Sequence, residues 1–226
     1  MAPAIELAEV GRAYGERTAL SGVTLTLEPG RTLAVFGANG AGKTTLLRIL
    51  ATLLRPHAGR TRVLGRDLPQ DGWAVRGRVG LLAHDPLLYR ELSARENLRF
   101  HAQLHGVDEA RMEALLDQVG MLRRADEPIR TLSLGMAQRV AICRASLHEP
   151  ELLLLDEPLA NLDPGAAEAV EPLIGRTAGP ARVVISHDVE HGLGEADLVL
   201  GLRSGRPEIL APVADVRPED VRGLYR

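Results

Sequence analysis

A glycine-rich turn between an apolar run and a helical pattern constrains the fold of this chain more than any other feature. Residues 32–36 (TLAVF) are largely apolar and bounded by glycine, as expected of a strand buried on both faces. Residues 45–54 carry apolar positions at helical spacing. Between them, residues 37–44 (GANGAGKT) match the pattern G-x-x-x-x-G-K-[ST] at every fixed position. A strand, a turn and a helix therefore follow one another directly.

The residue types in this turn suit phosphate binding. Glycines let the backbone curl so that successive N–H groups point at phosphate oxygens, and the following helix adds partial positive charge at its N-terminus. Lys43 would bring a compact charge to the β- and γ-phosphates of a nucleotide, and the Thr44 hydroxyl would face Mg²⁺. A chance match in a glycine-rich protein is the alternative, and the placement between strand and helix argues against it.

The choice of cation supports this interpretation. Lys43 is the single lysine among 27 lysine and arginine residues, so arginine supplies positive charge everywhere else. The planar guanidinium of arginine is wider and more rigid than an ammonium group and would not enter the loop in the same way. The sequence thus predicts a phosphate-binding loop at residues 37–44.

The bulk composition is that of an ordinary globular protein. With 226 residues, of which 45% are hydrophobic, the chain can bury the core of one α/β domain with a smaller lobe inserted. The net charge of -3 gives no indication of a nucleic-acid partner. Without an apolar stretch of about 18 residues or a targeting segment, we expect a cytoplasmic chain that would reach a membrane through a partner. The lone cysteine, Cys143, is expected to be buried and inert.

Hydrophobic patterning predicts a core of strands that is interrupted by helices. Residues 5–10 and 23–27 alternate like strands of an antiparallel patch, and residues 152–155, 182–186 and 197–202 indicate further strands. Residues 90–147 have a mostly helical pattern with breaks at Gly106 and Gly120. We predict an α/β fold with a P-loop core, residues 1–84 and about 148–226, and a helical subdomain at about 85–147. The tail after Pro207 has no predicted function.

Two later segments add chemistry to the loop. Asp156, at the end of an apolar run, is placed to hold Mg²⁺ through water, and Glu157 to orient or deprotonate a water that attacks the γ-phosphate. Two solvated acids after a strand are the alternative. Residues 132–139 (LSLGMAQR) place Ser133 and Gly135 just before a helix, where an anion could meet backbone N–H groups. By itself, this second segment would be interpreted as a helix cap.

Together these motifs resemble those of the ATP-binding cassette (ABC) ATPases over residues 4–205. The phosphate loop, residues 132–135 as the signature motif, and Asp156 with Glu157 as the Walker B pair occur in the order of that family. Residues 161–163 (NLD) match its D-loop, His187 its switch histidine, and Tyr14 the aromatic residue that stacks on adenine. The resemblance implies an ABC ATPase fold that binds and hydrolyses ATP.

The resemblance also implies an arrangement of two copies. Two such domains would face each other head to tail, each ATP lying between the loop of one copy and the signature motif of the other. Glu157 and His187 would be catalytic, and Thr44 and Asp156 would hold Mg²⁺. An integral permease subunit would hold this homodimer at the inner face of the cell membrane, with no nucleic acid involved. The residues implied to contact ATP are Tyr14, Gly37, Asn39, Gly40, Ala41, Gly42, Lys43, Thr44 and Thr45, with Ser133, Gly135 and Asp163 from the other copy.

Two positions depart from the usual pattern of the family. His84 stands where a glutamine touches Mg²⁺ and passes movement to the permease; an imidazole could do either, or the change could have no consequence. Leu159 replaces a commoner threonine. Both positions, and residues 91–100, are similar to the ATPase subunit of the cytochrome c biogenesis haem exporter. We therefore expect haem export, with export of drugs, lipids or polysaccharides as the alternative.

Other functional classes have weaker support. His101 and His105 lie four residues apart on a predicted helix and could ligate a metal or haem, but without a third ligand a solvated helix face is favoured. The chain has no Cys-x-x-Cys-His, which excludes covalent haem attachment. A soluble ABC ATPase of DNA repair, translation or iron–sulfur assembly remains an alternative. So does a regulatory module with an inactive site, against which Glu157 and His187 argue.

Overall fold

The computed structural model describes residues 2–226, which form ten β-strands and eight α-helices. The strands are β1 Ile5–Tyr14, β2 Arg17–Leu27, β3 Thr32–Phe36, β4 Ala58–Val63, β5 Arg66–Leu68, β6 Val79–Leu82, β7 Leu152–Asp156, β8 Ala181–Ile185, β9 Leu198–Arg203 and β10 Arg206–Pro212. The helices are α1 Lys43–Leu50, α2 Gly72–Arg76, α3 Ala94–His105, α4 Glu109–Gln118, α5 Leu134–Ser146, α6 Pro164–Ile174, α7 Val189–Glu195 and α8 Pro218–Gly223.

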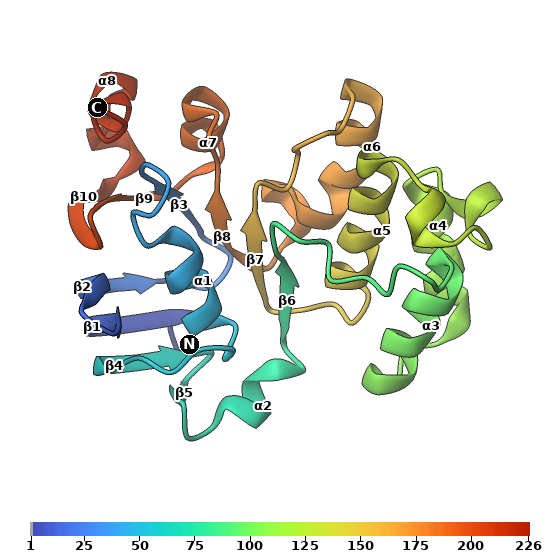
Figure 1. Cartoon of the computed structure of the whole chain (residues 1–226), viewed down its shortest axis with the longest axis horizontal. Coiled ribbons are helices and arrows are strands. Elements are labelled where there is room, and N and C mark those ends of the chain that lie inside the picture. Colours follow the sequence, from blue (N-terminus) through green and yellow to red (C-terminus); the bar gives the residue numbers. More distant parts are fainter. Residues whose placement is uncertain (1) are drawn as a thin grey trace.

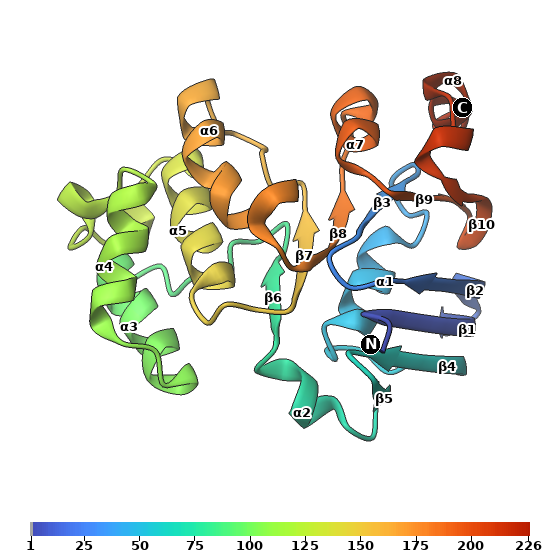
Figure 2. The same cartoon turned by 180° about the vertical axis from the view of Figure 1, so that it is seen from behind.

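The strands form two sheets with helices around them (Figure 1). The larger sheet has the order β10-β9-β3-β8-β7-β6. The five strands from β9 to β6 run parallel to one another, and β10 pairs antiparallel with β9 at the edge. The smaller sheet, β2-β1-β4-β5, is antiparallel. Helix α1 lies between the two sheets, and α3 to α6 gather on the far side of β6 and β7 (Figure 2).

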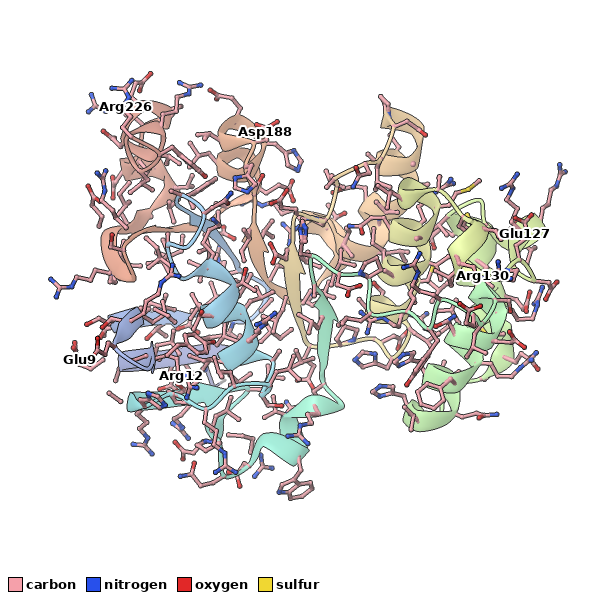
Figure 3. All side chains as sticks on the ribbon, viewed as in Figure 1. Glu9, Arg12, Glu127, Arg130, Asp188 and Arg226 are labelled. Carbon is pink, nitrogen blue, oxygen red and sulfur yellow. The ribbon has the colours of Figure 1, made fainter. Side chains whose placement is uncertain are left out.

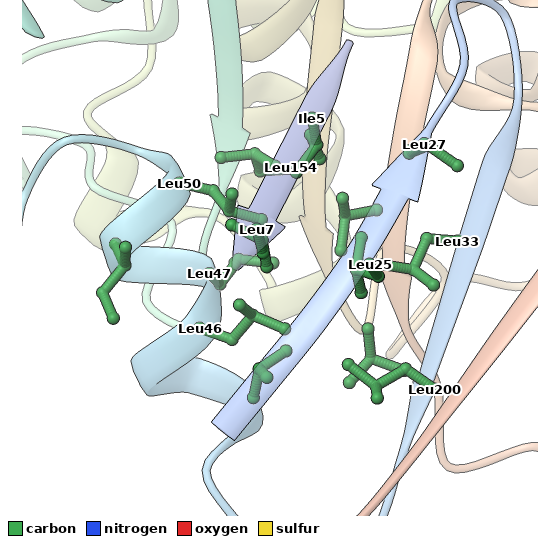
Figure 4. Packing of buried hydrophobic residues seen from close by; sticks show 14 of the residues in the cluster. Ile5, Leu7, Leu25, Leu27, Leu33, Leu46, Leu47, Leu50, Leu154 and Leu200 are labelled. Carbon is green, nitrogen blue, oxygen red and sulfur yellow. The ribbon is translucent and has the colours of Figure 1, made fainter. Parts of the chain in front are cut away.

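Helix α1 is held by apolar contacts with both sheets. Leu46, Leu47 and Leu50 of this helix are buried in one cluster with Leu25 of β2 and Leu33 of β3 (Figure 4). Burying one such side chain contributes about 1.5–3 kcal/mol, so these contacts fix the helix and the loop that precedes it.

The strands of the larger sheet are covered on both faces, as a parallel sheet requires. In β3, Leu33 and Val35 belong to the cluster with α1, whereas Ala34 and Phe36 belong to a second cluster with α7 and α8. Leu153 of β7 belongs to a third cluster, formed with α3 to α6. Residues of both faces are therefore apolar, and polar groups are left to the strand ends.

The predicted mixture of parallel and antiparallel sheets with an added group of helices is confirmed. The six predicted strand segments are present, some of them longer than predicted or displaced by one residue, and Gly106 and Gly120 end helical segments with positive φ. The division into a core and a helical subdomain at about residues 85–147 stays a proposal, because these helices share their apolar cluster with Leu153 of β7.

The helix predicted at residues 45–54 is too long at its C-terminal end, because α1 ends at Leu50. Thr52 has a φ of 62°, in the left-handed region, and so breaks the helical turn. Leu53 is consequently 63% exposed and does not extend the buried face. No helix within residues 2–226 is long and apolar enough to cross a membrane.

Cys143 is fully buried in α5, and burial raises the pKa of its thiol to about 12, in agreement with the predicted inert role. The predicted solvated helix face is correct for His105, which is exposed, and wrong for His101, which is half-buried. The His105 ring stacks on that of His148, with centroids 4.2 Å apart. Residues 2–226 contain no group of three or more His, Cys, Asp or Glu side chains that could hold a metal.

Acid should destabilise the fold through these histidines. Burial lowers the pKa of His101 and of His148 to about 4, and nearby positive charges add to the effect. The unfolded chain therefore binds more protons between about pH 4 and 6.5, and the free energy of unfolding falls as the pH falls through that range. Replacing both residues by glutamine should remove roughly 1–2 kcal/mol of this pH dependence, measured by urea unfolding at pH 7 and pH 5.

The exposed His191 offers a matched control for this experiment. His191→Gln makes the same substitution at an exposed position, and an equal loss of pH dependence there would show that burial of His101 and His148 is not the cause. An unchanged dependence in the double variant of His101 and His148 would show that packing does not hold these two rings neutral.

Candidate active site

The predicted phosphate loop connects the end of β3 to the start of α1 (Figure 1). Gly40 and Gly42 have φ values of 80° and 109°, which side chains with a Cβ rarely adopt. A Cβ on Gly42 would lie 2.4 Å from the carbonyl oxygen of Ala19, and one on Gly37 would lie 2.3 Å from that of Leu202. The loop therefore needs glycine both for its curl and for its close approach to neighbouring backbone.

Lys43 points into the curl of this loop. The residue is 8% exposed, and its Nζ donates to the carbonyl oxygens of Gly37 at 2.6 Å and Ala38 at 3.1 Å. Burial lowers the pKa of Lys43, and the charges of Asp156 and Glu157 oppose this shift. Phosphate oxygens would be stronger, charge-assisted partners for this ammonium group than the two neutral carbonyls.

Asp156, the last residue of β7, lies opposite the loop. The Thr44 hydroxyl donates to its Oδ2 at 3.4 Å. Burial raises the pKa of Asp156 and the Glu157 charge raises it further, whereas the charges of His84 and Lys43 lower it. A buried carboxylate beside a hydroxyl fits Mg²⁺, which prefers hard oxygen ligands and takes its remaining ligands from water and phosphate.

His84 follows β6, the strand beside β7, at the same end of the sheet as Asp156. Its charge lowers the pKa of Asp156, so the two side chains interact electrostatically. The structure thus brings His84 to the region of the candidate metal ligands. A part for His84 in metal binding stays a prediction.

Glu157 and His187 meet at the carboxyl end of the larger sheet. Glu157 follows β7 with a φ of 52°, and its N–H donates to the carbonyl of Ile185 at 2.9 Å. Its Oε1 lies 2.8 Å from Nε2 of His187, which follows β8. Because β7 and β8 are parallel neighbours, their ends bring these two side chains to one edge, beside the loop. The contact joins the two residues predicted to be catalytic.

Tyr14 and the loop share one hollow with a volume of about 380 Å³. The Tyr14 ring is 45% exposed, and the guanidinium of Arg12 lies 5.0 Å from its centroid in a cation–π contact. Ala41 is buried and packs into the cluster beneath the loop. The other predicted ATP-contacting residues in this hollow are Asn39, Gly40, Gly42, Lys43, Thr44 and Thr45.

Ser133, Gly135 and Asp163 do not line this hollow. The side chains of Ser133 and Asp163 cap the N-termini of α5 and α6. A Cβ on Gly135 would lie 2.4 Å from the carbonyl oxygen of Asn161, so Gly135 packs against the segment that follows Glu157. Within one chain the two halves of the predicted ATP site are therefore apart, which is compatible with a site completed by a second copy.

Residues 20–160 match the protein family described as ABC transporter. This segment contains the phosphate loop and the carboxylate pair described above. The chain belongs to the ABC transporter family. The match contains the phosphate loop, Ser133 and Glu157, whereas Tyr14 and His187 lie outside the matched residues.

Curated members of the ABC transporter family are similar to three quarters or more of the chain. The phosphonates import ATP-binding protein PhnC of Anaeromyxobacter dehalogenans is 37% identical over 240 residues, covering 99% of this chain and 48% of that protein. The daunorubicin resistance ATP-binding protein DrrA3 of Streptomyces coeruleorubidus is 39% identical over 180 residues, covering 77% of this chain and 57% of that protein. The chain thus spans about half the length of these two relatives.

Solved structures of ABC cassettes share the fold. An ATP-binding subunit of an ABC transporter superposes with a TM-score of 0.86 at 29% identity, covering 98% of this chain and 94% of that one. A dimeric ATP-binding cassette in a post-hydrolysis state, bound to ADP and Pi, gives a TM-score of 0.83 at 25% identity over 92% of this chain and 98% of that one. The predicted ABC ATPase fold is therefore confirmed.

Gln138 is a site residue for which the sequence predicted no role. It is 7% exposed on α5, and its Nε2 donates to the carbonyl oxygen of Pro158 at 3.1 Å. The same nitrogen lies 3.5 Å from the carbonyl oxygen of Glu157. The available signal was a polar side chain at a position that shares the helical spacing of the apolar residues of α5. In this ABC chain it connects the helix that begins at Ser133 to the backbone of Glu157.

Gln138→Ala should destabilise the fold by about 1–3 kcal/mol, because it leaves the buried carbonyl oxygen of Pro158 without this donor. Urea unfolding at neutral pH measures the change. Gln118→Ala is the matched control, since the exposed Gln118 makes only a long bond to the carbonyl of Ala169, at 3.4 Å. Equal losses in the two variants would contradict a special part for Gln138.

Proposed function

We propose that this chain is the ATP-hydrolysing subunit of an ABC transporter and powers transport through a separate membrane permease. The contact between Glu157 and His187, 2.8 Å long and beside the phosphate loop, carries the proposal. A regulatory module that only bound nucleotide would not need a carboxylate and an imidazole held together at this edge.

In the proposed site, the hollow of Tyr14 and the loop binds ATP. The open face of the Tyr14 ring stacks on adenine, and the loop amides face the phosphates. Lys43 exchanges its two carbonyl partners for phosphate oxygens. Thr44 and Asp156 would hold Mg²⁺, which supplies positive charge to the phosphate oxygens when it is bound.

Glu157 acts in this proposal on the attacking water. Its carboxylate accepts a hydrogen bond from that water and orients it, or removes its proton, as the water approaches the γ-phosphorus. His187 would hold the Glu157 carboxylate through the contact at 2.8 Å, and its side chain, 44% exposed, stays accessible to a bound nucleotide. The left-handed backbone at Glu157 ends the extended conformation of β7 at this residue.

Two copies would complete the site, because Ser133, Gly135 and Asp163 lie away from the loop of their own chain. In a head-to-tail homodimer, these residues of one copy would face the ATP bound by the other. ATP then favours the closed pair, and only this difference in affinity between closed and open pairs can drive a permease. Hydrolysis removes the difference and lets the pair separate.

Glu157→Gln should keep ATP binding and slow hydrolysis by about 10²- to 10⁴-fold, because the amide cannot take a proton from the water. Phosphate release measures the rate, and size-exclusion chromatography with MgATP should show a trapped dimer. Glu151→Gln makes the same chemical change just before the other end of β7 and serves as control. Near-normal turnover of Glu157→Gln would remove the catalytic assignment.

We further propose haem export as the transported process, on the sequence features at His84, Leu159 and residues 91–100. A second candidate is another cargo, favoured by the printed names of relatives: phosphonates import, molybdenum import and Fe(3+) ions import proteins, and a daunorubicin resistance protein. None of these names concerns haem.

Purification in mild detergent from cells that express the tagged chain should recover an integral permease in the membrane fraction, where the chain would lie peripherally on the inner face. The identity of that permease separates the two cargo candidates: one that binds haem supports haem export, and one that binds another compound overturns it. Recovery of a soluble, monodisperse chain without an integral partner would overturn the transporter proposal in favour of a soluble ABC ATPase.

A further inference from the structure

A tyrosine for which neither the sequence motifs nor the proposed mechanism provides a role reaches the phosphate loop. Tyr225, in the turn after α8, accepts a long but part-buried hydrogen bond through its hydroxyl oxygen from the N–H of Gly37, at 3.5 Å. Gly37 is the first residue of the loop. Tyr225 therefore connects a late segment of the chain to the point where β3 passes into the loop.

The ring of the same tyrosine faces the switch histidine. The ring centroids of Tyr225 and His187 are 6.3 Å apart with the planes inclined at 56°. Tyr225 also lines two adjoining hollows, one with His187 and the other with Ala38 and Asn39. It thus stands between the phosphate loop and the residue that contacts Glu157.

Packing fixes this position. Val221 and Leu224 are buried in the cluster that contains Phe36 of β3. Leu224 also packs so closely over Gly201 that a Cβ there would lie 2.7 Å from it. Arg222 forms an ion pair with Glu190, and α7 and α8 stand together at one end of the molecule, where Figure 3 labels Asp188 and Arg226. The turn that carries Tyr225 is therefore held in place by apolar contacts, one of them with Phe36 at the end of β3, just before the phosphate loop.

The hydroxyl of Tyr225 keeps its proton at neutral pH. Burial raises the pKa of Tyr225 and the charge of Glu157 raises it further, while the bond from Gly37 opposes the shift. A neutral phenol can accept from Gly37 and still donate its own proton.

We propose that Tyr225 is a positioning residue for the hydrolysis proposed above: its hydroxyl holds the first amide of the phosphate loop, and its ring limits the directions open to His187. The inference rests on the proposed function. Gly37 forms two hydrogen bonds with side chains: its N–H donates to Tyr225, and its carbonyl oxygen accepts from Lys43. When Lys43 turns to a phosphate, its bond to Gly37 is lost, whereas the Tyr225 bond can remain and keep the loop in shape.

Two substitutions separate the two contacts. Tyr225→Phe removes the hydroxyl and keeps the ring, so the loop loosens and KM for ATP should rise about three- to tenfold with kcat changed by less than about twofold. Tyr225→Leu also removes the ring, so His187 gains freedom and kcat should fall in addition by about tenfold. ATP hydrolysis by the whole chain at saturating Mg²⁺ gives both constants.

NMR of the nucleotide-free chain provides a readout that does not depend on turnover. The Gly37 amide signal should shift in both variants, and the imidazole C–H signals of His187 only in Tyr225→Leu. Tyr89→Phe removes the hydroxyl of a tyrosine on the helical side and should change neither the constants nor these signals. Thermal unfolding identifies any variant whose loss of activity follows from loss of folded protein.

Several outcomes would overturn the inference. Tyr225→Phe and Tyr225→Leu could match the wild type, could lower kcat equally without a change in KM, or could raise kcat, which would make the tyrosine a restraint. If the wild-type chain hydrolyses ATP, any one of these three outcomes overturns the positioning role of Tyr225 and leaves the proposed function intact. A wild-type chain that does not hydrolyse ATP overturns the proposed function and this role together.

Discussion

Parallel pairing of β3, β8 and β7 determines where polar groups can lie in this protein. Both faces of these strands are covered by apolar clusters, so polar side chains fit best beyond the strand ends. Because the three strands run in the same direction, Gly37 after β3, Glu157 after β7 and His187 after β8 come to one edge. Helix α1 packs between the two sheets, and the loop that joins β3 to α1 therefore lies at the same edge.

The charges at this edge are incompletely paired within the chain. Burial lowers the pKa of Lys43 and raises the pKa of Asp156, so the protein environment opposes the charged form of each. Their mutual attraction offsets part of this effect. An anion beside Lys43 and a cation beside Asp156 would oppose these shifts, which agrees with the proposed binding of Mg²⁺ and a nucleotide phosphate.

The sequence was most informative where local pattern and burial agree. Residues 32–36 and 152–155 are apolar on both faces, and they became the buried strands β3 and β7. The loop was recognisable because glycine is needed at fixed positions along the chain itself. The extent of α1 was not predictable from periodicity, since Leu53 and Leu54 continue the apolar spacing but the left-handed Thr52 ends the helix.

The parts that could not be predicted depend on contacts between distant segments. Strand β10 alternates between exposed and half-buried residues and contains prolines, so its sequence resembles a loop until β9 pairs with it. Tyr225 is separated from Gly37 by almost the whole chain, and no local spacing connects them. The bond from Gln138 to Pro158 likewise becomes visible only when α5 packs against the segment after β7.

That last contact has a mechanical consequence. Gln138 bonds to the backbone beside Glu157, and Gly135 is pressed against the carbonyl of Asn161 with no room for a methyl group. The first two turns of α5 are therefore connected to residues 157–161 by a hydrogen bond and a close backbone contact. A displacement of α5 would therefore be passed directly to the backbone beside Glu157, the residue proposed to act on the attacking water.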